Sequence, residues 1–264
     1  MAAILAFNAA LLFALIMGLW LYSIKIKDVS FIDAFWAFGM VILAVSTFIQ
    51  LDSAGEPRQL LIVGLSAIWG LRLSAHLLSR WKAHGVDPRY ARIMGGLMEK
   101  KGWSFGKASL LQVFLLQAPL LFVVCLPAQL GQFDPQSPIG PMAFVGAIIA
   151  LVGIGFESIG DAQLKTFKAN PANKGKVLDA GLWRFTRHPN YFGDCCTWWG
   201  IYLIAAETSS GIWSFPGPML LTFLLVKWSG VPMLERGLAK TRPGYADYIA
   251  RTSSFIPWPP KSAK

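Results

Sequence analysis

The chain contains a series of apolar stretches that are each long enough to cross a membrane. They lie at about 2–23, 31–50, 60–79, 109–130, 139–163, 190–208 and 214–234. An α-helix needs about 20 apolar residues to span the ~30 Å hydrocarbon core. Hydrophobic residues make up 55% of the 264 residues and charged residues 14%, which is not the balance of a soluble domain. We therefore predict an all-α, polytopic integral membrane helical bundle with about seven transmembrane helices.

Basic residues gather in alternate connections between these stretches. Almost all of the 24 Lys and Arg lie in 25–27, 80–107, 165–187 and 236–264. Because basic loops stay in the cytosol, we expect the N-terminus outside, the C-terminus inside, and a bacterial inner membrane with an active site open to the cytosol. The net charge of +10 then follows from topology and predicts no nucleic-acid partner. A basic cytosolic face also suits anionic membrane lipids or an anionic cofactor.

No repeat or long linker divides the sequence, so we predict a single membrane domain over 1–264. The longest connections on the basic side are 80–108 and 165–189, and chemistry is expected there. The three cysteines and three histidines show no metal-ligand spacing, so no metal site is expected. The sequence does not indicate an oligomeric state.

Ionisable residues stand at the mouth of the sixth apolar stretch, where Arg187-His188-Pro189 precedes it. Pro189 suits the first position of a helix because no N–H is needed there. In a helix that starts here, Asn190, Asp194 and Trp198 follow at i, i+4 and i+8, and so share one face. A carboxylate about one turn inside an apolar span is costly, and Asp194 is therefore a functional-site hypothesis.

The fifth apolar stretch continues into a polar helical end. A helix from 141 to 168 would measure about 42 Å, longer than the bilayer core. Its last turns carry Glu157, Asp161, Lys165 and Lys168 on one face. The two lysines are equally explained as groups that solubilise the end of a helix. Glu157 and Asp161 lie nearer the apolar part and need partners.

These residues resemble those of one known family. The segment from Gly181 to Asp194, the polar-faced fifth helix, and Leu234-Glu235-Arg236 with Arg242-Pro243-Gly244-Tyr245 resemble the bacterial branch of the steroid 5-alpha-reductase superfamily. The resemblance is strong over the C-terminal half and weak over the N-terminal half. It implies that 1–130 encloses a lipid substrate, that 139–264 binds NADPH, and that an activated carbon–carbon double bond is reduced.

The resemblance also implies which residues hold the cofactor. They are Asp161, Lys165, Lys168, Asn190, Asp194, Trp198, Glu235, Arg236 and Tyr245 or Tyr248, together with Glu157, Arg187, His188 and Tyr191 from the same segments. Arg and Lys are charge-assisted donors to the phosphates of NADPH, whereas amide and carboxylate groups suit its carboxamide and ribose. No Gly-x-Gly-x-x-Gly fingerprint is present, so the site would not be a Rossmann site.

The expected catalytic half departs from the family pattern. Where the animal steroid reductases use a glutamate and a tyrosine, this chain has Asp33 and Trp69. Since an indole cannot relay a proton, the acid must come from elsewhere. Trp69, Arg72 and His76 share one face of the third helix, and Asp33, Arg72 and His76 are the candidates for polarising a substrate carbonyl.

Structural readings of these groups remain open. Asp33 and Arg72 can instead form an ion pair that closes the bundle, and His76 can be a packed core histidine. Tyr22 and Tyr90, the latter expected in a loop, are secondary proton donors. The predicted topology puts Glu56 at the membrane face opposite Tyr90, so Glu56 is a weaker catalytic candidate than Asp33, Arg72 and His76.

Two other functions remain as alternatives. Arg-His-Pro-x-Tyr also resembles the S-adenosylmethionine-dependent membrane methyltransferases of the isoprenylcysteine or phospholipid type. Because S-adenosylmethionine carries no phosphate, the basic residues would then reflect topology only. A non-catalytic sterol- or lipid-binding protein would need the cavity but no cofactor. The reductase, acting with NADPH on a 3-oxo-Δ4 steroid or related enone lipid, is the function we expect.

Overall fold

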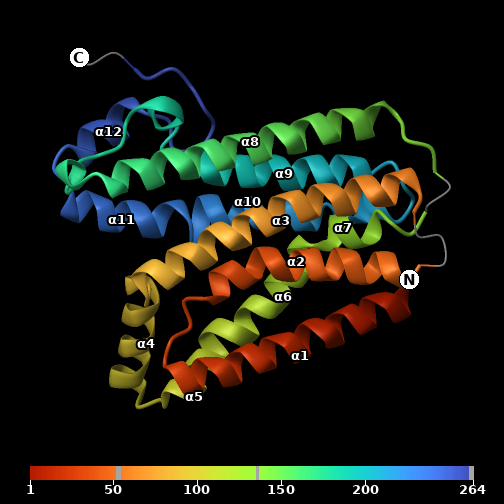
Figure 1. Ribbon diagram of the computed structural model, residues 1–264, viewed down its shortest axis with the longest axis horizontal. Helices are drawn as coiled ribbons and strands as arrows, with labels where there is room; N and C mark the ends of the chain where they lie inside the picture. The colour runs from red at the N-terminus through yellow and green to blue at the C-terminus, as the bar shows by residue number, and fades with distance from the viewer. Residues whose placement is uncertain (52–54, 135–136, 262–264) are drawn as a thin grey trace. The chain divides into compact units, whose positions relative to one another are not determined.

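The computed structural model describes residues 1–51, 55–134 and 137–261, and these residues form helices and no strand (Figure 1). The all-α prediction is confirmed. The longer helices are α1 (Ala2–Ile26), α2 (Ile32–Ile49), α3 (Pro57–His84), α4 (Pro88–Lys101), α6 (Leu115–Val124), α8 (Pro141–Ala169), α9 (Pro189–Ala205) and α11 (Val231–Thr241). The shorter ones are α5 (Phe105–Ser109), α7 (Leu126–Leu130), α10 (Pro216–Phe223) and α12 (Tyr245–Arg251), with π-helical turns over Leu110–Phe114 and Leu224–Trp228.

Among the described residues, 6 helical segments are long and apolar enough to cross a membrane. They are Ala2–Ile26, Ile32–Ile49, Pro57–His84, Phe105–Val124, Pro141–Ala169 and Gly211–Thr241. The predicted span 190–208 is represented by α9, which has 17 residues and so measures about 26 Å. That is less than the hydrocarbon core, and the predicted count of seven spans is not confirmed. The orientation of the termini stays a prediction.

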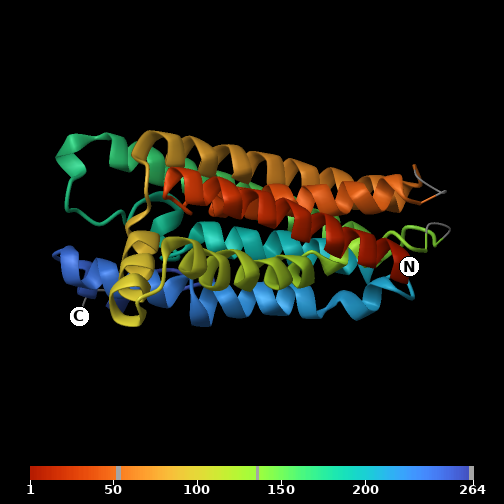
Figure 2. The ribbon, with the colours of Figure 1, turned by 90° about the horizontal axis from the view of Figure 1, so that it is seen from below.

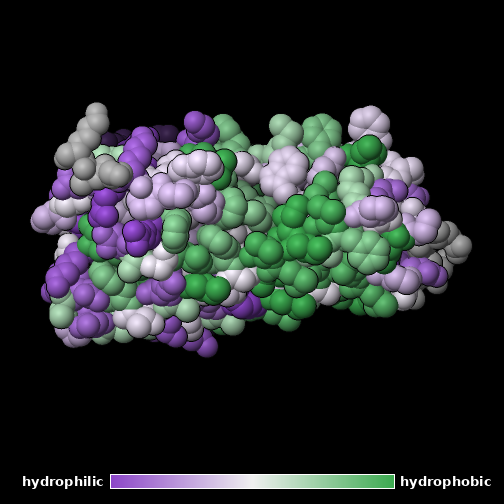
Figure 3. All heavy atoms as spheres, turned by 90° about the horizontal axis from the view of Figure 1, so that it is seen from above, coloured by the Kyte–Doolittle hydropathy of each residue, from purple (hydrophilic) through white to green (hydrophobic). Residues whose placement is uncertain are grey.

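The surfaces of these helices are apolar. On α8 the exposed side chains include Phe144, Ile148 and Leu151, each more than half exposed. Figure 3 shows one face of the molecule, on which apolar residues form a broad band and hydrophilic residues gather toward the ends. A soluble protein does not leave so much contiguous apolar surface in water. The chain is therefore a membrane protein.

The described chain divides into two compact units. Unit 1 contains residues 1–140 and 204–217, and unit 2 contains residues 141–203 and 218–264. The boundary at 140/141 lies close to the predicted division between a substrate half and a cofactor half. The assignment of these roles, and of one domain over 1–264, stays a prediction.

Unit 1 is organised around the antiparallel pair α2 and α3. Gly70 lets the two helices approach closely, since a Cβ there would lie 2.8 Å from the carbonyl oxygen of Ala37. Figures 1 and 2 show α1, α2 and α3 running lengthwise, with α4 lying across their ends, far from the N-terminus. Asp87 caps α4, accepting a hydrogen bond from the N–H of Arg89 at 2.8 Å, and Pro88 fills its first position.

The opposite end of unit 1 holds a buried ion pair. Arg58 Nη2 lies 2.9 Å from Glu207 Oε2, and the guanidinium also donates to the carbonyls of Ile204 and Pro138. Glu207 accepts a further hydrogen bond from the N–H of Gly140 at 2.8 Å. Arg58 therefore ties together the connections between helices at this end of unit 1.

Unit 2 is organised around the close pair α8 and α9. A Cβ on Gly153 would lie 2.5 Å from the carbonyl oxygen of Gly193, and a Cβ on Gly200 would lie 2.4 Å from that of Gly146. Small residues at such spacing let membrane helices meet backbone to backbone. The contact fixes which α8 residues face the start of α9.

We expect Gly153→Ala to destabilise the protein and Gly155→Ala, on the same helix, to leave it intact. A Cβ at Gly155 meets nothing within 4 Å, whereas one at Gly153 is forced against α9. Both changes raise helix propensity, by about 1 kcal/mol, so the difference reports packing alone. Overpacking costs typically about 1–3 kcal/mol. Thermal unfolding in detergent is the measurement, and equal midpoints for the two variants would contradict the close approach.

Candidate functional site

Polar residues of α8 and α9 meet where the two helices pack. Asn190 Nδ2 donates to Asp161 Oδ1 at 3.4 Å, and Glu157 and Asp161 are both buried. Gly193 lies against the Glu157 backbone, since a Cβ on Gly193 would be 2.6 Å from the Glu157 nitrogen. Asp194 follows directly on α9 and is half-buried. The structure thus brings together the two helix faces that the sequence predicted separately.

A charged cluster joins the start of α9 to α11. Arg187 Nε donates to Glu235 Oε1 at 2.7 Å, and Nη2 donates to Oε2 at 3.2 Å. His188 Nε2 lies 3.0 Å from Glu235 Oε1, and the His188 ring stacks on Tyr191 with centroids 5.3 Å apart. Arg187 and His188 are both buried. One carboxylate therefore holds two consecutive residues of the Arg-His-Pro motif.

The remaining donors of Arg187 hold the C-terminal segment. Nη1 donates to the carbonyls of Ile249 and Thr252, at the end of α12, and the backbone N–H of Arg187 donates to the carbonyl of Ser253 at 2.9 Å. Carbonyls at the end of a helix need such donors. The guanidinium is thus engaged by protein groups, and its predicted contact with a cofactor stays a prediction.

Two tyrosines of α12 complete this region. The Tyr248 hydroxyl donates to the carbonyl of Trp183, whose indole donates to the carbonyl of Gly160 at 3.1 Å. Burial, together with the charge of Glu235, raises the pKa of Tyr245 to about 12. Burial and Tyr245 also raise the pKa of Tyr248 above its ordinary value. Both phenols are neutral at physiological pH, and each can donate a hydrogen bond.

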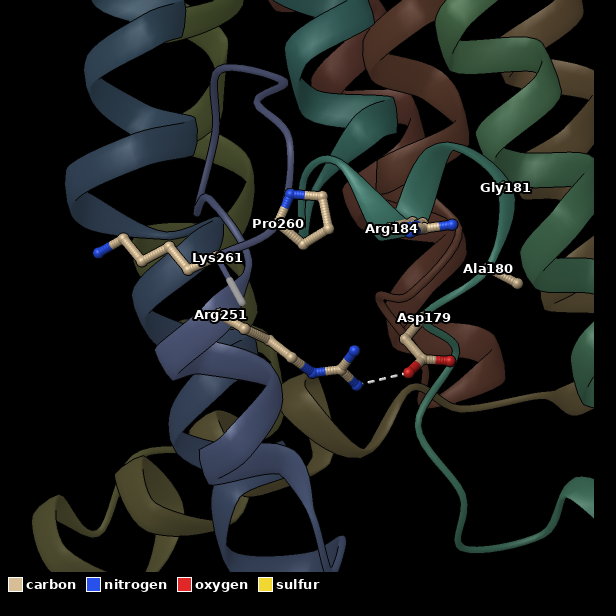
Figure 4. Close-up of a pocket in the computed structure, with 7 residues that line it drawn as sticks. All are labelled: Asp179, Ala180, Gly181, Arg184, Arg251, Pro260 and Lys261. Atoms are coloured by element: carbon tan, nitrogen blue, oxygen red, sulfur yellow. Dashed lines mark hydrogen bonds and ion pairs between the residues drawn. The ribbon is translucent and has the colours of Figure 1, made fainter. Parts of the chain in front are cut away.

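Trp198, on α9, is fully buried, whereas the predicted cations Lys165, Lys168 and Arg236 are exposed. Unit 2 also contains a surface cavity of about 560 Å³. Its lining residues are Asp179, Ala180, Gly181, Arg184, Arg251, Pro260 and Lys261 (Figure 4). Arg251 Nη2 lies 2.5 Å from Asp179 Oδ2, and both side chains remain well exposed. Such an exposed pair is worth little in water.

A second polar cluster lies in unit 1, around Asp33 at the start of α2. Arg89 Nη2 lies 2.7 Å from Asp33 Oδ2, and the Tyr90 hydroxyl donates to Asp33 Oδ1 at 2.6 Å. Gln117 Nε2 donates to the Tyr90 oxygen at 3.3 Å, and Trp36 Nε1 donates to Gln117 Oε1 at 2.6 Å. The cluster connects α2, α4 and α6 through side chains that can bind an oxygen atom.

Burial and neighbouring charges shift the pKa values of three residues at the start of α4. Burial raises the pKa of Asp87, but hydrogen bonds and charge from Arg89 outweigh it and hold that pKa below its ordinary value. Burial lowers the pKa of Arg89, and the carboxylates of Asp87 and Asp33 more than reverse this. Burial and the Asp33 charge raise the pKa of Tyr90 well above 10.0. Tyr90 therefore keeps its proton at physiological pH.

The structure gives Asp33 an arginine partner that the sequence did not suggest, and the alternative pair of Asp33 with Arg72 stays a prediction. Asp33 pairs with Arg89, because the cap at Asp87 starts α4 early enough to bring Arg89 over the end of α2. Arg72 and His76 are half-buried and Trp69 is buried. Their catalytic roles stay predictions.

The register of α2 and α3 nevertheless agrees with the predicted neighbourhood. Gly70 packs on Ala37, and the helices are antiparallel. Moving four residues back from Ala37 and four forward from Gly70 places Asp33 level with a point between Arg72 and His76. The predicted residues therefore lie at the same end of the pair.

The sequence suggested Tyr90 only as a secondary proton donor and did not suggest Gln117 as a site residue. Tyr90 was expected in a loop, but it lies in the first turn of α4. Asp87-Pro88, an N-cap residue followed by proline, was the available signal for that helix. Gln117 lies inside an apolar span, where a polar side chain is itself a signal. Glu56 forms a capping box at the far end of α3, as its lower rank anticipated.

Comparison with known proteins gives the family. The family model described as "Protein of unknown function (DUF1295)" matches residues 19–252. This family is related to steroid 5-alpha-reductase-like membrane proteins. The uncharacterized protein C594.04c of Schizosaccharomyces pombe (strain 972 / ATCC 24843) is 22% identical over 280 residues, covering 95% of this chain and 79% of that protein.

A second relative matches only a short segment. The probable O-methyltransferase ustE of Ustilaginoidea virens is 45% identical over 51 residues, which are 19% of this chain and 18% of that protein. The chain thus matches less than a fifth of that relative. No solved structure matches. Since the family model covers most of the sequence, this helical membrane protein belongs to the DUF1295 family.

Proposed function

We propose that the protein uses NADPH to reduce an activated carbon–carbon double bond in a hydrophobic substrate. The observation that carries the proposal is the hydrogen bond between Asn190 and Asp161, which assembles an amide and carboxylates on the paired faces of α8 and α9. The same unit exposes Lys165, Lys168 and Arg236. The DUF1295 family is related to steroid 5-alpha-reductase-like membrane proteins, and this relation supports the same function.

The donor set in unit 2 fits the chemistry of NADPH. Asn190 offers both amide functions that a nicotinamide carboxamide requires, and Asp161 and Asp194 can accept from ribose hydroxyls. Exposed ammonium and guanidinium groups suit phosphates. When bound, NADPH supplies a hydride for the β carbon of an enone.

Within the proposed reaction, the Asp33 cluster polarises the substrate carbonyl. Tyr90 keeps its proton because its pKa is raised, so it acts as a hydrogen-bond donor to an oxygen that gains negative charge. Without substrate, the Tyr90 hydroxyl donates its one proton to Asp33 and accepts from Gln117, so on substrate binding it exchanges Asp33 for the carbonyl oxygen as acceptor. Such donors are most effective in a site that excludes water, and the apolar helices of unit 1 provide those surroundings. A 3-oxo-Δ4 steroid or a related enone lipid fits this chemistry.

A second candidate is methyl transfer from S-adenosylmethionine to a membrane substrate. The 45% identity over 51 residues to a probable O-methyltransferase favours it. In that case the cofactor would carry a sulfonium and no phosphate, and the exposed cations of unit 2 would not contribute to binding. The two candidates therefore differ in salt dependence as well as in ligand.

A nucleotide titration of the purified protein tests the proposal. We expect NADPH to bind more tightly than S-adenosylmethionine, with affinity falling as salt rises because phosphate contacts are screened. Asn190→Ala and Asp194→Asn should each weaken NADPH binding by about 1–3 kcal/mol, since a hydrogen-bonding partner of the cofactor is lost. Cys195→Ala, on the same helix, is the control and should change binding little. Tighter binding of S-adenosylmethionine would favour the methyltransferase instead.

A further inference from the structure

One corner of unit 1 gathers lysines on aromatic rings. The Lys101 ammonium lies 4.8 Å from the centroid of the Trp103 ring, and the Lys107 ammonium lies 5.0 Å from the same centroid. The Lys27 ammonium lies 5.4 Å from the centroid of the Phe105 ring. We call Lys27, Lys101 and Lys107 the lysine corner. All three side chains are exposed, whereas the two rings are half-buried.

The backbone beneath the lysine corner is held in place. The Trp20 indole of α1 donates to the carbonyl of Gly106 in α5 at 3.0 Å. Ser104 caps α5, and Lys27 closes α1 in the left-handed region with φ 54°. Because that conformation is disfavoured for a lysine, the surrounding packing has to hold it. The three cations are therefore brought together by the fold.

Among the described residues, the carboxylates nearest in sequence form no ion pair with these cations. Asp28 follows Lys27, but its Oδ1 accepts from the Ser30 hydroxyl at 2.6 Å and its Oδ2 accepts from the Trp81 indole at 2.7 Å. Glu99 precedes Lys101 by two positions, so the two project from different faces of α4. The ammonium groups of Lys101 and Lys107 lie 4.8 and 5.0 Å from one ring centroid. They therefore repel each other within about one screening length of physiological salt, which is roughly 8–10 Å. An anion between them would relieve that repulsion.

The lysine corner lies at the ends of two candidate membrane spans. The span Ala2–Ile26 ends one residue before Lys27, and the span Phe105–Val124 begins two residues after Trp103. Groups at such positions lie at the level of lipid headgroups, where tryptophan is also favoured. Each lysine close to an anionic surface adds electrostatic attraction to it.

We propose that the lysine corner binds the phosphate of an anionic phospholipid. A compact ammonium is a point charge that suits a headgroup phosphate without demanding one orientation. The apolar rings of Trp103 and Phe105 lie beside the ammonium groups, at the depth where lipid headgroups meet the acyl chains. This site is separate from the proposed cofactor residues, so its occupancy does not depend on the reductase proposal.

The test is thermal unfolding of the full chain in nanodiscs. Discs of phosphatidylcholine alone are compared with discs of equal parts phosphatidylcholine and phosphatidylglycerol. The site variant carries Lys27→Gln, Lys101→Gln and Lys107→Gln. The control variant carries Lys174→Gln, Lys176→Gln and Lys240→Gln, which removes the same charge from exposed positions of unit 2. A ligand that binds only the folded state raises the unfolding midpoint.

We expect phosphatidylglycerol to raise the midpoint of the wild type and of the control variant by several degrees, and that of the site variant by much less. An equal rise in all three proteins would overturn the proposal. In phosphatidylcholine discs, inorganic phosphate at matched ionic strength should give no rise. A rise there that the site variant loses would assign the corner to a free anion and overturn the lipid assignment. Should the triple variant not fold, Lys107→Gln alone should show a reduced rise, and an undiminished one would contradict the proposal.

Discussion

Replacing Tyr90 with Phe is expected to lower turnover by about 10²–10³-fold, the typical effect of removing one donor to a developing oxyanion. The Tyr90 hydroxyl is held between Asp33 Oδ1 and Gln117 Nε2, and the variant keeps the ring while losing only the O–H. Affinity for NADPH should not change, because the proposed cofactor residues lie on α8, α9, α11 and α12 and in the segment just before α9. The measurement is NADPH oxidation with a panel of enone lipids, beside a nucleotide titration.

The pH profile of turnover gives an independent readout of Tyr90. Burial and the Asp33 charge raise its pKa well above 10.0, so the neutral phenol should persist throughout the physiological range. We expect no loss of turnover from phenol ionisation between neutral pH and about pH 10. Tyr202→Phe, at a tyrosine with no assigned role in the reaction, is the control and should leave turnover unchanged. Full activity of Tyr90→Phe would show that the cluster only ties α4 to α2.

The second large effect is on stability, at Glu235. Replacing Glu235 with Ala should destabilise the protein by about 3 kcal/mol, the lower end of the range for breaking a buried ion pair. The lower end applies because the Glu235 side chain is 17% exposed, whereas that of its partner Arg187 is 8% exposed. The change leaves Arg187 and His188 without their shared carboxylate. Chemical unfolding in detergent is the measurement.

An exposed ion pair of the same unit supplies the control for Glu235. Asp179→Ala removes the partner of Arg251, but both of these side chains are well exposed, so the cost should be below about 1 kcal/mol. Glu235→Gln keeps a hydrogen-bond acceptor and should lie between wild type and Glu235→Ala. If Glu235→Ala folds normally but no longer binds NADPH, Glu235 belongs to the cofactor site and not to the anchor of the C-terminal segment.

Local signals in the sequence predicted helix starts well. Pro189 begins α9, and α8 extends from Pro141 to Ala169, close to the predicted end at 168. Both follow from rules that act within a few residues: proline fits the first turn, and apolar length fixes a span. The two polar faces were each predicted, but the contact between Asn190 and Asp161 was not, because it depends on how α8 and α9 pack.

Partners from distant parts of the chain were harder to predict. Arg187 is held by Glu235, which lies 48 positions away, and Asp33 is held by Arg89, which lies 56 positions away. The sequence shows that a buried charge needs a partner but does not show which of several is in reach. Tyr90 was misjudged for the same reason: its position depends on how α4 lies across the ends of α2 and α3.

Transfer of a labelled hydride tests the central claim most directly. The purified protein is incubated with enone lipids and NADPH carrying deuterium at C4 of the nicotinamide, and the products are analysed by mass spectrometry. The account predicts a reduced lipid with one deuterium at the β carbon, and its loss in Tyr90→Phe. Methylated lipid formed from S-adenosylmethionine, with no oxidation of NADPH by any substrate, would contradict it.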